Sequence, residues 1–340
     1  MNAVVFMTNK NVELQDRPMP VARRANEVLI RVIACGLCGS DLRTMTDPPQ
    51  MSCNPNTVLG HEIVGEVEEI GTASGFAKGD VVVVVPNFPC RTCFTCRRGL
   101  INLCDDFEHI GSHTDGGLAE FVSVPSEFLY LVPSGLDPYV AALVEPLACV
   151  LNGTTRANWM PEEPVVILGG GPIGLLFLAM AKLSGAWPIV VSEPNPARAN
   201  VALDIGADHV VDPREPDSLA RIMELVGGHG APTVIDALGT LLESALTLVS
   251  KGGEIFSFGV NHEAKVTISQ AVIVDKEVTI HGVYIAKGTF PLALKLLSDH
   301  QDLFAKVVSH RIPLSEWERA KSLLMSGESP GKILITMGGQ

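Results

Sequence analysis

The sequence predicts an α/β protein built of two domains, and three observations support this. The chain has 340 residues, which is long enough to bury two hydrophobic cores. Glycine is abundant at 32 residues and aromatic residues make up only 5%, while short valine-rich runs recur, a composition typical of parallel strands buried on both faces. From about residue 164 onward, strand-like and helix-like segments alternate along the chain.

The first part of the chain, up to about residue 150, favours short strands separated by glycine and proline. Several of these segments alternate apolar and polar residues, as half-buried strands do. The clearest segments are Glu27–Ala34, Ile63–Ile70, Asp80–Pro86 and Leu118–Val124. We therefore expect a β-rich domain in this part of the chain.

The middle of the chain predicts a doubly wound parallel sheet, because strands and helices follow each other in strict alternation. The predicted strands are Pro164–Gly169, Pro188–Glu193, His209–Asp212, Pro232–Leu238 and Gly253–Gly259. The predicted helices are Pro172–Ser184, Pro196–Ile205, Asp217–Val226 and Leu241–Val249. After Tyr284 the order changes to helix, strand, helix, strand, ending with Lys332–Thr336. We assign residues 151–285 to this domain, and residues 1–150 and 286–340 to the β-rich one.

Half of the eight cysteines lie within fifteen residues, with the spacing Cys-x2-Cys-x2-Cys-x7-Cys. They are Cys90, Cys93, Cys96 and Cys104. Thiolates this close cannot all form unstrained disulfides, but they can surround Zn²⁺ as a tetrahedron. A set of buried or disulfide-bonded cysteines is the alternative that the spacing disfavours. A site closed by four sulfurs has no open position, so we expect this zinc to stabilise the fold and to take no part in chemistry.

A glycine-rich turn lies between the first predicted strand and helix of the second domain. Gly169 would make the tight turn, Gly171 would let the backbone approach a pyrophosphate, and Gly174 would let helix and strand pack closely. Pro172 and Ile173 begin the helix whose N-terminus would face the phosphates. A purely structural turn is the alternative, but the strand–turn–helix context favours a dinucleotide site of the Rossmann type.

Glu193 ends the second predicted strand, nineteen residues past the last glycine of the turn. An acid there accepts hydrogen bonds from the ribose 2′-hydroxyl and repels a 2′-phosphate, which favours NAD over NADP. Arg198 could flank the adenosine, soften that preference, or lie on an exposed helix face. Gly239 follows one predicted strand and Gly259 ends the next, so both should lie at the same carboxyl edge of the sheet.

A second set of metal-ligand types is scattered along the chain: Cys38, His61, Glu62 and Glu145. Each has an ordinary interpretation, since single cysteines usually pack in cores and a lone histidine is often structural. Glu145 could be an ordinary charge near a helix N-terminus. The sequence separation by itself does not show that the four side chains meet.

Six segments together resemble the zinc-containing medium-chain alcohol and polyol dehydrogenases, in family order over essentially the full chain. They are Gly36–Asp41, Gly60–Glu62, Cys90–Cys104, Asp115–Glu120, Glu145–Ala148 and Gly169–Gly174. The pair Glu145–Pro146 looks like the sorbitol, threonine and galactitol-phosphate dehydrogenase branch. The resemblance implies a β-rich, GroES-like catalytic domain joined to a Rossmann domain that binds NAD.

The resemblance also implies roles for the scattered residues. Cys38, His61 and Glu62 would hold a catalytic zinc, with Glu145 bound to the zinc or its water and the two acids able to exchange roles. This mixed sulfur, nitrogen and oxygen set leaves the open position that a catalytic zinc needs. Ser40 matches the hydroxyl that begins proton release from the alcohol, although a serine there could also be a turn or cap residue.

Arg43 departs from the family pattern, because some relatives carry a histidine at the matching position. Arginine stays charged and cannot relay protons at neutral pH, so protons would leave through Glu145, water or the cofactor ribose. Arg43 could bind an anionic substrate group or be a surface charge. His109 and His113 could reach the substrate, although loop histidines are often exposed.

The predicted function is a zinc-dependent oxidoreductase that transfers hydride between NAD and a secondary alcohol, namely a polyol, a sugar or a sugar-derived alcohol. A sugar-phosphate or threonine-type dehydrogenase is the alternative, and a non-catalytic scaffold that binds NAD and zinc is a more distant one. The expected partner is a small alcohol or ketone. The resemblance implies a homo-oligomer, a dimer or a tetramer.

Composition excludes other classes of partner. The net charge of −13 argues against binding to nucleic acid or to an anionic membrane surface. The longest apolar stretches are too short to span a bilayer. Eight cysteines without a secretion signal favour a reducing compartment, so we expect a cytoplasmic protein.

Overall fold

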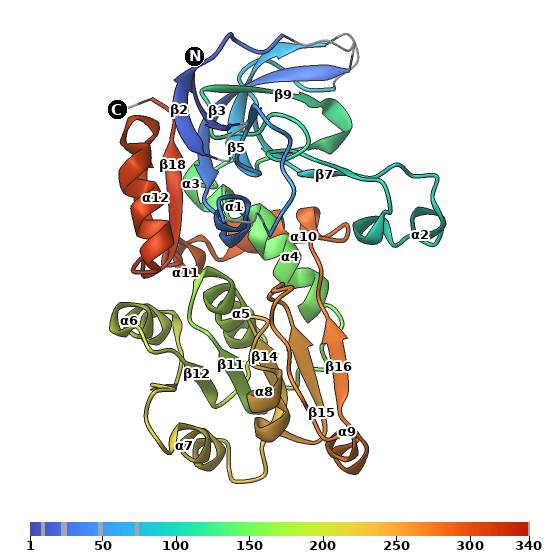
Figure 1. The fold of residues 1–340 in the computed structure, drawn as a ribbon, viewed down its shortest axis with the longest axis vertical. Helices are drawn as coiled ribbons and strands as arrows, with labels where there is room; N and C mark the ends of the chain where they lie inside the picture. Colours follow the sequence, from blue (N-terminus) through green and yellow to red (C-terminus); the bar gives the residue numbers. More distant parts are fainter. Residues whose placement is uncertain (8–10, 22–25, 47–49, 72–74, 339–340) are drawn as a thin grey trace. The chain divides into compact units, whose positions relative to one another are not determined.

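The computed structural model describes residues 1–7, 11–21, 26–46, 50–71 and 75–338, and the chain divides into two compact units. The first unit comprises Met1–Ala148 and Ala286–Gln340, and the second comprises Cys149–Ile285. Figure 1 shows the β-rich first unit and the alternating strands and helices of the second. The predicted α/β fold class, a β-rich part plus a doubly wound parallel sheet, is thereby confirmed.

Strands of the first unit form one large sheet and two small ones. The large sheet has the order β10 (Leu129–Leu131), β6 (Val81–Val84), β5 (Glu62–Ile70), β3 (Glu27–Gly36), β18 (Lys332–Thr336), β17 (Val308–Pro313), with β9 (Phe121–Pro125) paired to β3. The small sheets are β2 (Val12–Asp16), β1 (Asn2–Phe6) and β4 (Thr57–Val58), and the pair β7 (Asn87–Phe88) and β8 (Glu108–His109). Strand β3 is central because its alternate residues Val28, Ile30 and Val32 are fully buried in the core that this sheet encloses.

Short helices complete the first unit. They are α1 (Gly39–Thr44), α2 (Phe94–Arg97), α3 (Pro138–Ala141), α10 (Phe290–Asp299), α11 (Gln301–Ala305) and α12 (Trp317–Ser326), with 3-10 turns η1 (Ile101–Leu103), η2 (Ser126–Phe128) and η3 (Leu314–Glu316). Helix α4 (Val144–Thr154) begins in the first unit and continues into the second. Among the described residues, no helix has both the length and the hydrophobicity that crossing a bilayer requires.

The second unit is a six-stranded sheet in which every pair of neighbours is parallel. Its order is β13 (His209–Val211), β12 (Ile189–Ser192), β11 (Val165–Leu168), β14 (Ala231–Asp236), β15 (Val249–Ser257), β16 (Thr279–Gly282). The helices are α5 (Pro172–Leu183), α6 (Pro196–Ile205), α7 (Ser218–Leu225), α8 (Leu242–Leu248) and α9 (Gln270–Lys276). Because the order reverses direction beside β11, the turn after this strand lies at a topological switch point, where ligands bind in such sheets.

Two details of this sheet differ from the sequence prediction. Strand β15 begins at Val249, directly after α8, and not at Gly253. The edge strand β16 was not predicted, because three of its four residues are exposed and it has no apolar run. Neither difference moves the glycine-rich turn.

Candidate metal and nucleotide sites

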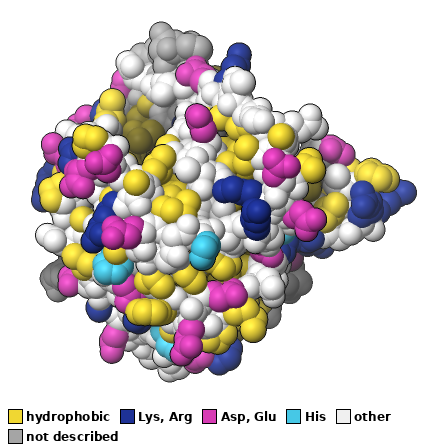
Figure 2. Space-filling view, turned by 90° about the horizontal axis from the view of Figure 1, so that it is seen from below, with side chains coloured by type: hydrophobic (Ala, Val, Ile, Leu, Met, Phe, Trp, Pro, Cys, Tyr) yellow, Lys and Arg dark blue, Asp and Glu magenta, His cyan; other side chains and the backbone are white. Residues whose placement is uncertain are grey.

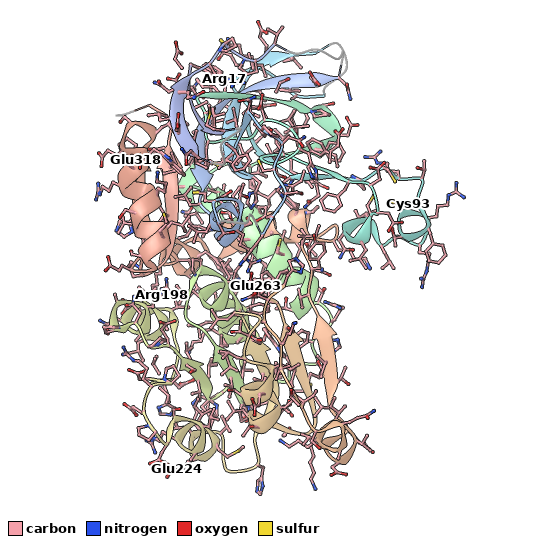
Figure 3. The ribbon with its side chains drawn as sticks, in the orientation of Figure 1. Arg17, Cys93, Arg198, Glu224, Glu263 and Glu318 are labelled. Carbon is pink, nitrogen blue, oxygen red and sulfur yellow. The ribbon has the colours of Figure 1, made fainter. Side chains whose placement is uncertain are left out.

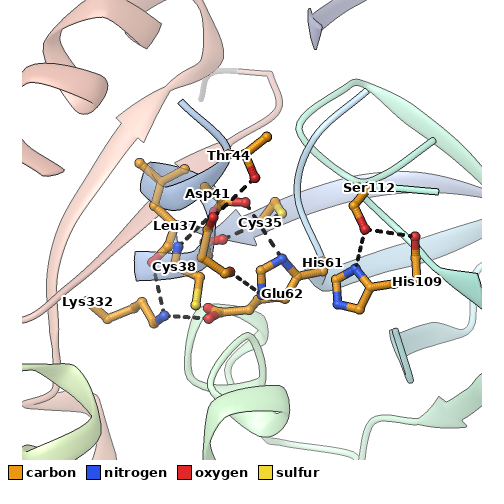
Figure 4. A network of polar contacts seen from close by, with 12 residues as sticks. Cys35, Leu37, Cys38, Asp41, Thr44, His61, Glu62, His109, Ser112 and Lys332 are labelled. Carbon is orange, nitrogen blue, oxygen red and sulfur yellow. Dashed lines mark hydrogen bonds and ion pairs between the residues drawn. The ribbon is translucent and has the colours of Figure 1, made fainter. Parts of the chain in front are cut away.

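Pairing between β3 and β5 brings Cys38, His61 and Glu62 together. Gly36 at the end of β3 pairs with Glu62 at the start of β5, so residues just beyond both positions lie at the same end of the sheet. Cys38 then occupies the N-cap position of α1. One ligand atom from each of the three side chains lies within 4.8 Å of the others, as Figure 4 shows in close-up.

Asp41 orients two members of this group. Its Oδ2 accepts a hydrogen bond from the backbone N–H of Cys38 (2.9 Å), and its Oδ1 lies 3.7 Å from Nδ1 of His61. The opposite ring nitrogen, Nε2, lies 3.5 Å from the hydroxyl oxygen of Ser40. Nε2 of His61 is therefore turned toward the ligand group, as a metal-binding imidazole with a carboxylate on its other nitrogen would be.

The site concentrates negative charge around a buried imidazole. Burial alone would lower the pKa of His61, but the hydrogen bond to Cys38 and the charges of Asp41, Cys38 and Glu145 raise it to about 10. The same negatively charged surroundings favour the binding of a divalent metal ion.

Glu62 is fully buried and is held from one side only. Its Oε1 accepts a hydrogen bond from Nζ of Lys332 (2.6 Å), and Lys332 also donates to the carbonyl oxygen of Leu37 (3.0 Å). Its Oε2 is buried without a hydrogen-bond partner. A Cβ at position 36 would overlap with this oxygen, so Gly36 leaves the space that Glu62 occupies. Buried carboxylate oxygens are normally satisfied, and a zinc ion bound by sulfur, nitrogen and this oxygen would satisfy it.

The other predicted residues of this site lie at different distances from it. Glu145, in the first turn of α4, is buried and close enough for its charge to raise the pKa of His61 and of Lys332. The metal-ligand group found among the described residues nevertheless comprises Cys38, His61 and Glu62 without Glu145. Arg43 lies in the last turn of α1 and is partly buried. The roles of Glu145 and Arg43 stay predictions.

The sequence prediction missed Lys332. This lysine is 3% exposed, although it stands 270 residues from its partner Glu62. A lysine at the start of an apolar strand is a weak signal, because most such lysines reach water. Only the pairing of β18 with β3 brings it to the site.

The four cysteines of the projecting lobe also converge, with their sulfur atoms within 4.8 Å of one another. Figure 3 marks the lobe by Cys93. The thiol of Cys93 lies 3.1 Å from the hydroxyl of Thr95, and with backbone N–H groups this contact lowers the pKa of Cys93 to about 6. No disulfide forms among the described cysteines. Four clustered sulfurs, one of them a ready thiolate, fit a closed zinc site.

The glycine-rich turn has the geometry that its spacing predicts. Gly169 has a φ of +105°, and Gly171 is the N-cap of α5, with Pro172 and Ile173 in the first turn of this helix. A Cβ at Gly174 would overlap with the carbonyl oxygen of Gly169. The N-terminus of α5 can therefore approach a pyrophosphate closely.

Glu193 contacts this turn directly. Its two carboxylate oxygens accept hydrogen bonds from the backbone N–H groups of Gly170 (2.7 Å) and Asn195 (2.8 Å). Nη1 of Arg198 on α6, marked in Figure 3, lies 4.0 Å from where a Cβ of Gly171 would be. A basic group thus stands beside the predicted phosphate site, and the roles of both side chains toward a nucleotide remain predictions.

Gly239 and Gly259 lie against each other at the carboxyl ends of β14 and β15. A Cβ at either position would overlap with the backbone of the other strand's glycine or its neighbour Leu238. Only glycine at both positions lets the two loops come this close, at the sheet edge where nucleotides bind.

Comparison with known proteins agrees with both sites. The family model described as "Alcohol dehydrogenase GroES-like domain" matches residues 24–134, and that described as "Zinc-binding dehydrogenase" matches residues 172–299. The chain is 31% identical over 304 residues to sorbitol dehydrogenase from Bacillus subtilis (strain 168), covering 88% of this chain and 86% of the relative. It is 33% identical over 321 residues to L-threonine 3-dehydrogenase from Pyrococcus horikoshii, covering 92% and 91%.

A solved structure described as a zinc-binding dehydrogenase from Sinorhizobium meliloti 1021 bound to NADP superposes with a TM-score of 0.88. The two sequences are 30% identical, and 98% of each chain is covered. The chain belongs to the family of zinc-type medium-chain alcohol and polyol dehydrogenases. It is accordingly a zinc-dependent oxidoreductase that acts on an alcohol group.

Proposed function

We propose that the chain oxidises a secondary alcohol of a polyol, sugar or sugar-derived compound, with NAD as the oxidant. The observation that supports this most directly is the group Cys38, His61 and Glu62, in which the buried carboxylate oxygen Oε2 of Glu62 lacks a hydrogen-bond partner. Three donors of this mixed kind hold a zinc ion with one position left for substrate. The related sorbitol and threonine dehydrogenases both oxidise a hydroxyl group on a carbon chain that carries further polar groups, which supports this substrate class.

Zinc at this site supplies Lewis-acid chemistry, and the nicotinamide ring supplies the hydride acceptor. The chain's own residues bind, orient and move protons. Cys38, His61 and Glu62 would hold the metal, and Asp41 keeps the first two in place. The hydroxyl of Ser40, 3.5 Å from Nε2 of His61, is placed to take the alcohol proton.

The proton must then leave without Arg43, because a guanidinium stays protonated at neutral pH. Glu145 is the candidate acceptor among the predicted residues, since it is buried and its charge acts on His61. We infer that Glu145 receives the proton, and it would be the acid able to hold the metal in place of Glu62. Replacement of Glu145 by glutamine would lower kcat and leave the metal content intact.

The substrate class is tested by following NADH absorbance with zinc-loaded protein and a panel of alcohols. The panel comprises sorbitol, meso-2,3-butanediol, 2-butanol, galactitol 1-phosphate and L-threonine. We expect turnover of sorbitol or the diol, and loss of turnover in Cys38→Ser with Cys53→Ser as the matched control. Reduction of NAD by none of the panel would contradict the proposal. Turnover of galactitol 1-phosphate alone or of L-threonine alone would instead support the alternative, a sugar-phosphate or threonine-type dehydrogenase.

We further propose that the chain forms a homo-oligomer, is located in the cytoplasm and does not bind nucleic acid. Strand β16 ends the parallel sheet with Ile280 37% exposed, so a second copy could pair there. No disulfide forms among the described cysteines, which suits a reducing compartment. Lys and Arg are interspersed with Asp and Glu on the face in Figure 2, and the net charge is −13. Light scattering of the wild type and Ile280→Pro would test the assembly.

A further inference from the structure

His109 lies beside the candidate metal site although it ligates nothing there. Its ring centroid is 5.1 Å from that of His61, and Figure 4 shows the two rings next to each other. Three glycines produce this proximity. Side chains at Gly111 or Gly116 would collide with the backbone of Gly60, so the turn after His109 packs directly on the residue before His61.

The ring of His109 is held in one orientation. Its Nδ1 lies 3.0 Å from the hydroxyl oxygen of Ser112, and that hydroxyl also lies 3.4 Å from the carbonyl oxygen of His109. A carbonyl can only accept, so the serine hydrogen goes to it, and Nδ1–H donates to Ser112. The backbone N–H of His109 donates to Nδ1 of His113 (3.1 Å). Nε2 of His109 then carries no hydrogen, and its lone pair can accept a hydrogen bond.

This lone pair has no hydrogen-bond partner among the described residues. The His109 side chain is 8% exposed, and Nε2 is not among the fully buried polar atoms, so a small molecule can reach this acceptor. Beside it, the ligand group of His61 would hold the metal to which an alcohol binds. Because the two ring centroids are only 5.1 Å apart, a short alcohol bound at that metal would also be within reach of His109.

We propose that His109 determines substrate specificity by accepting, at Nε2, a hydrogen bond from a second hydroxyl group of the alcohol. The inference rests on the function proposed above and deepens it. It requires that diols and polyols are preferred over alcohols with a single hydroxyl, because the acceptor would otherwise be left unsatisfied when water is excluded. Ser112 acts on substrate only through His109 and is a positioning residue.

The test compares meso-2,3-butanediol with 2-butanol, which share one carbon skeleton and differ by one hydroxyl. The readout is the ratio of their kcat/KM values in wild type, His109→Phe and His109→Gln, with exposed His229→Gln as the control. We expect His109→Phe to lower the ratio about tenfold, the effect of one neutral hydrogen bond, and His109→Gln to restore much of it. Ser112→Ala should lower the ratio in the same direction.

A second readout does not depend on turnover. Saturation-transfer NMR should show diol bound more tightly than 2-butanol by wild type and not by His109→Phe, while both proteins retain equal zinc. An equal loss with both alcohols, or an unchanged ratio, would overturn the inference and leave the proposed function standing. Turnover of no alcohol by the wild type would instead count against the function itself.

Discussion

At the scale of single residues, the ion pair of Lys332 and Glu62 has the largest consequence for the site. Both side chains are at most 3% exposed, and the lysine bonds to only one carboxylate oxygen. The other oxygen, Oε2, is buried without a hydrogen-bond partner. Lys332 therefore neutralises the buried acid and leaves one of its two oxygens without a partner.

We predict that Lys332→Met destabilises the protein by about 3 kcal/mol, because breaking a buried pair leaves an uncompensated charge. On dialysis the variant should also lose zinc from the group formed by Cys38, His61 and Glu62. Urea unfolding and metal analysis measure both effects. The matched control is Lys295→Met, which removes an exposed pair with Asp299 and should cost less than about 1 kcal/mol. Equal stability of the two variants would contradict this role for Lys332.

Glu193 gives a second prediction at this scale. Its carboxylate holds Gly170 and stands where a 2′-phosphate would be repelled. With Arg198 beside the turn, Glu193→Ala should shift the ratio of kcat/KM from NAD toward NADP by at least about tenfold. Glu224→Ala, on the exposed face of α7, should leave the ratio unchanged. A variant that loses both cofactors equally would show that Glu193 serves only to hold the turn.

At the scale of elements, the contact between β11 and α5 depends on a missing side chain. Gly174 lets the first turn of the helix sit on the carbonyl oxygen of Gly169. We expect Gly174→Ala to destabilise the protein by about 2 kcal/mol, since the added methyl group forces helix and strand apart. It should also weaken NADH binding, measured by fluorescence titration. Gly282→Ala on β16 is the control, because a Cβ there meets nothing. Unaltered NADH affinity in Gly174→Ala would contradict this account.

Elements also show where sequence patterns stop being informative. The buried strands β11 and β14 carry apolar runs, so they were predicted. Strand β16 is a four-residue edge strand with mostly exposed residues, and hydrogen bonds to β15, not hydrophobic periodicity, define it. An edge strand of this kind can therefore be recognised from its pairing in the structure but not from the sequence pattern.

At the scale of the whole molecule, the two donor groups should hold zinc ions with different roles. The four-cysteine group is closed by protein sulfurs, whereas the group at Cys38 leaves a position for a small molecule. We expect one zinc ion for each group, and Cys93→Ser should remove one of them. The melting temperature should fall by about 5 °C or more, because structural zinc contributes directly to folding.

Cys53→Ser is the control for this experiment, because Cys53 belongs to neither donor group. It should change neither the zinc content nor the melting temperature appreciably. A full zinc complement in Cys93→Ser, measured by atomic absorption, would show that the lobe does not hold a metal through that thiolate.

The sequence alone determined the fold class, the family and the two local motifs. The four cysteines and the glycine-rich turn are each confined to a short segment, so local spacing carries their geometry. Only the tertiary structure brought Cys38, His61 and Glu62 within 4.8 Å, left Glu145 outside that group, and placed Lys332 and His109 beside it. These residues meet through strand pairing and glycine-to-glycine packing between segments distant in sequence, and such contacts leave no periodic signal along the chain.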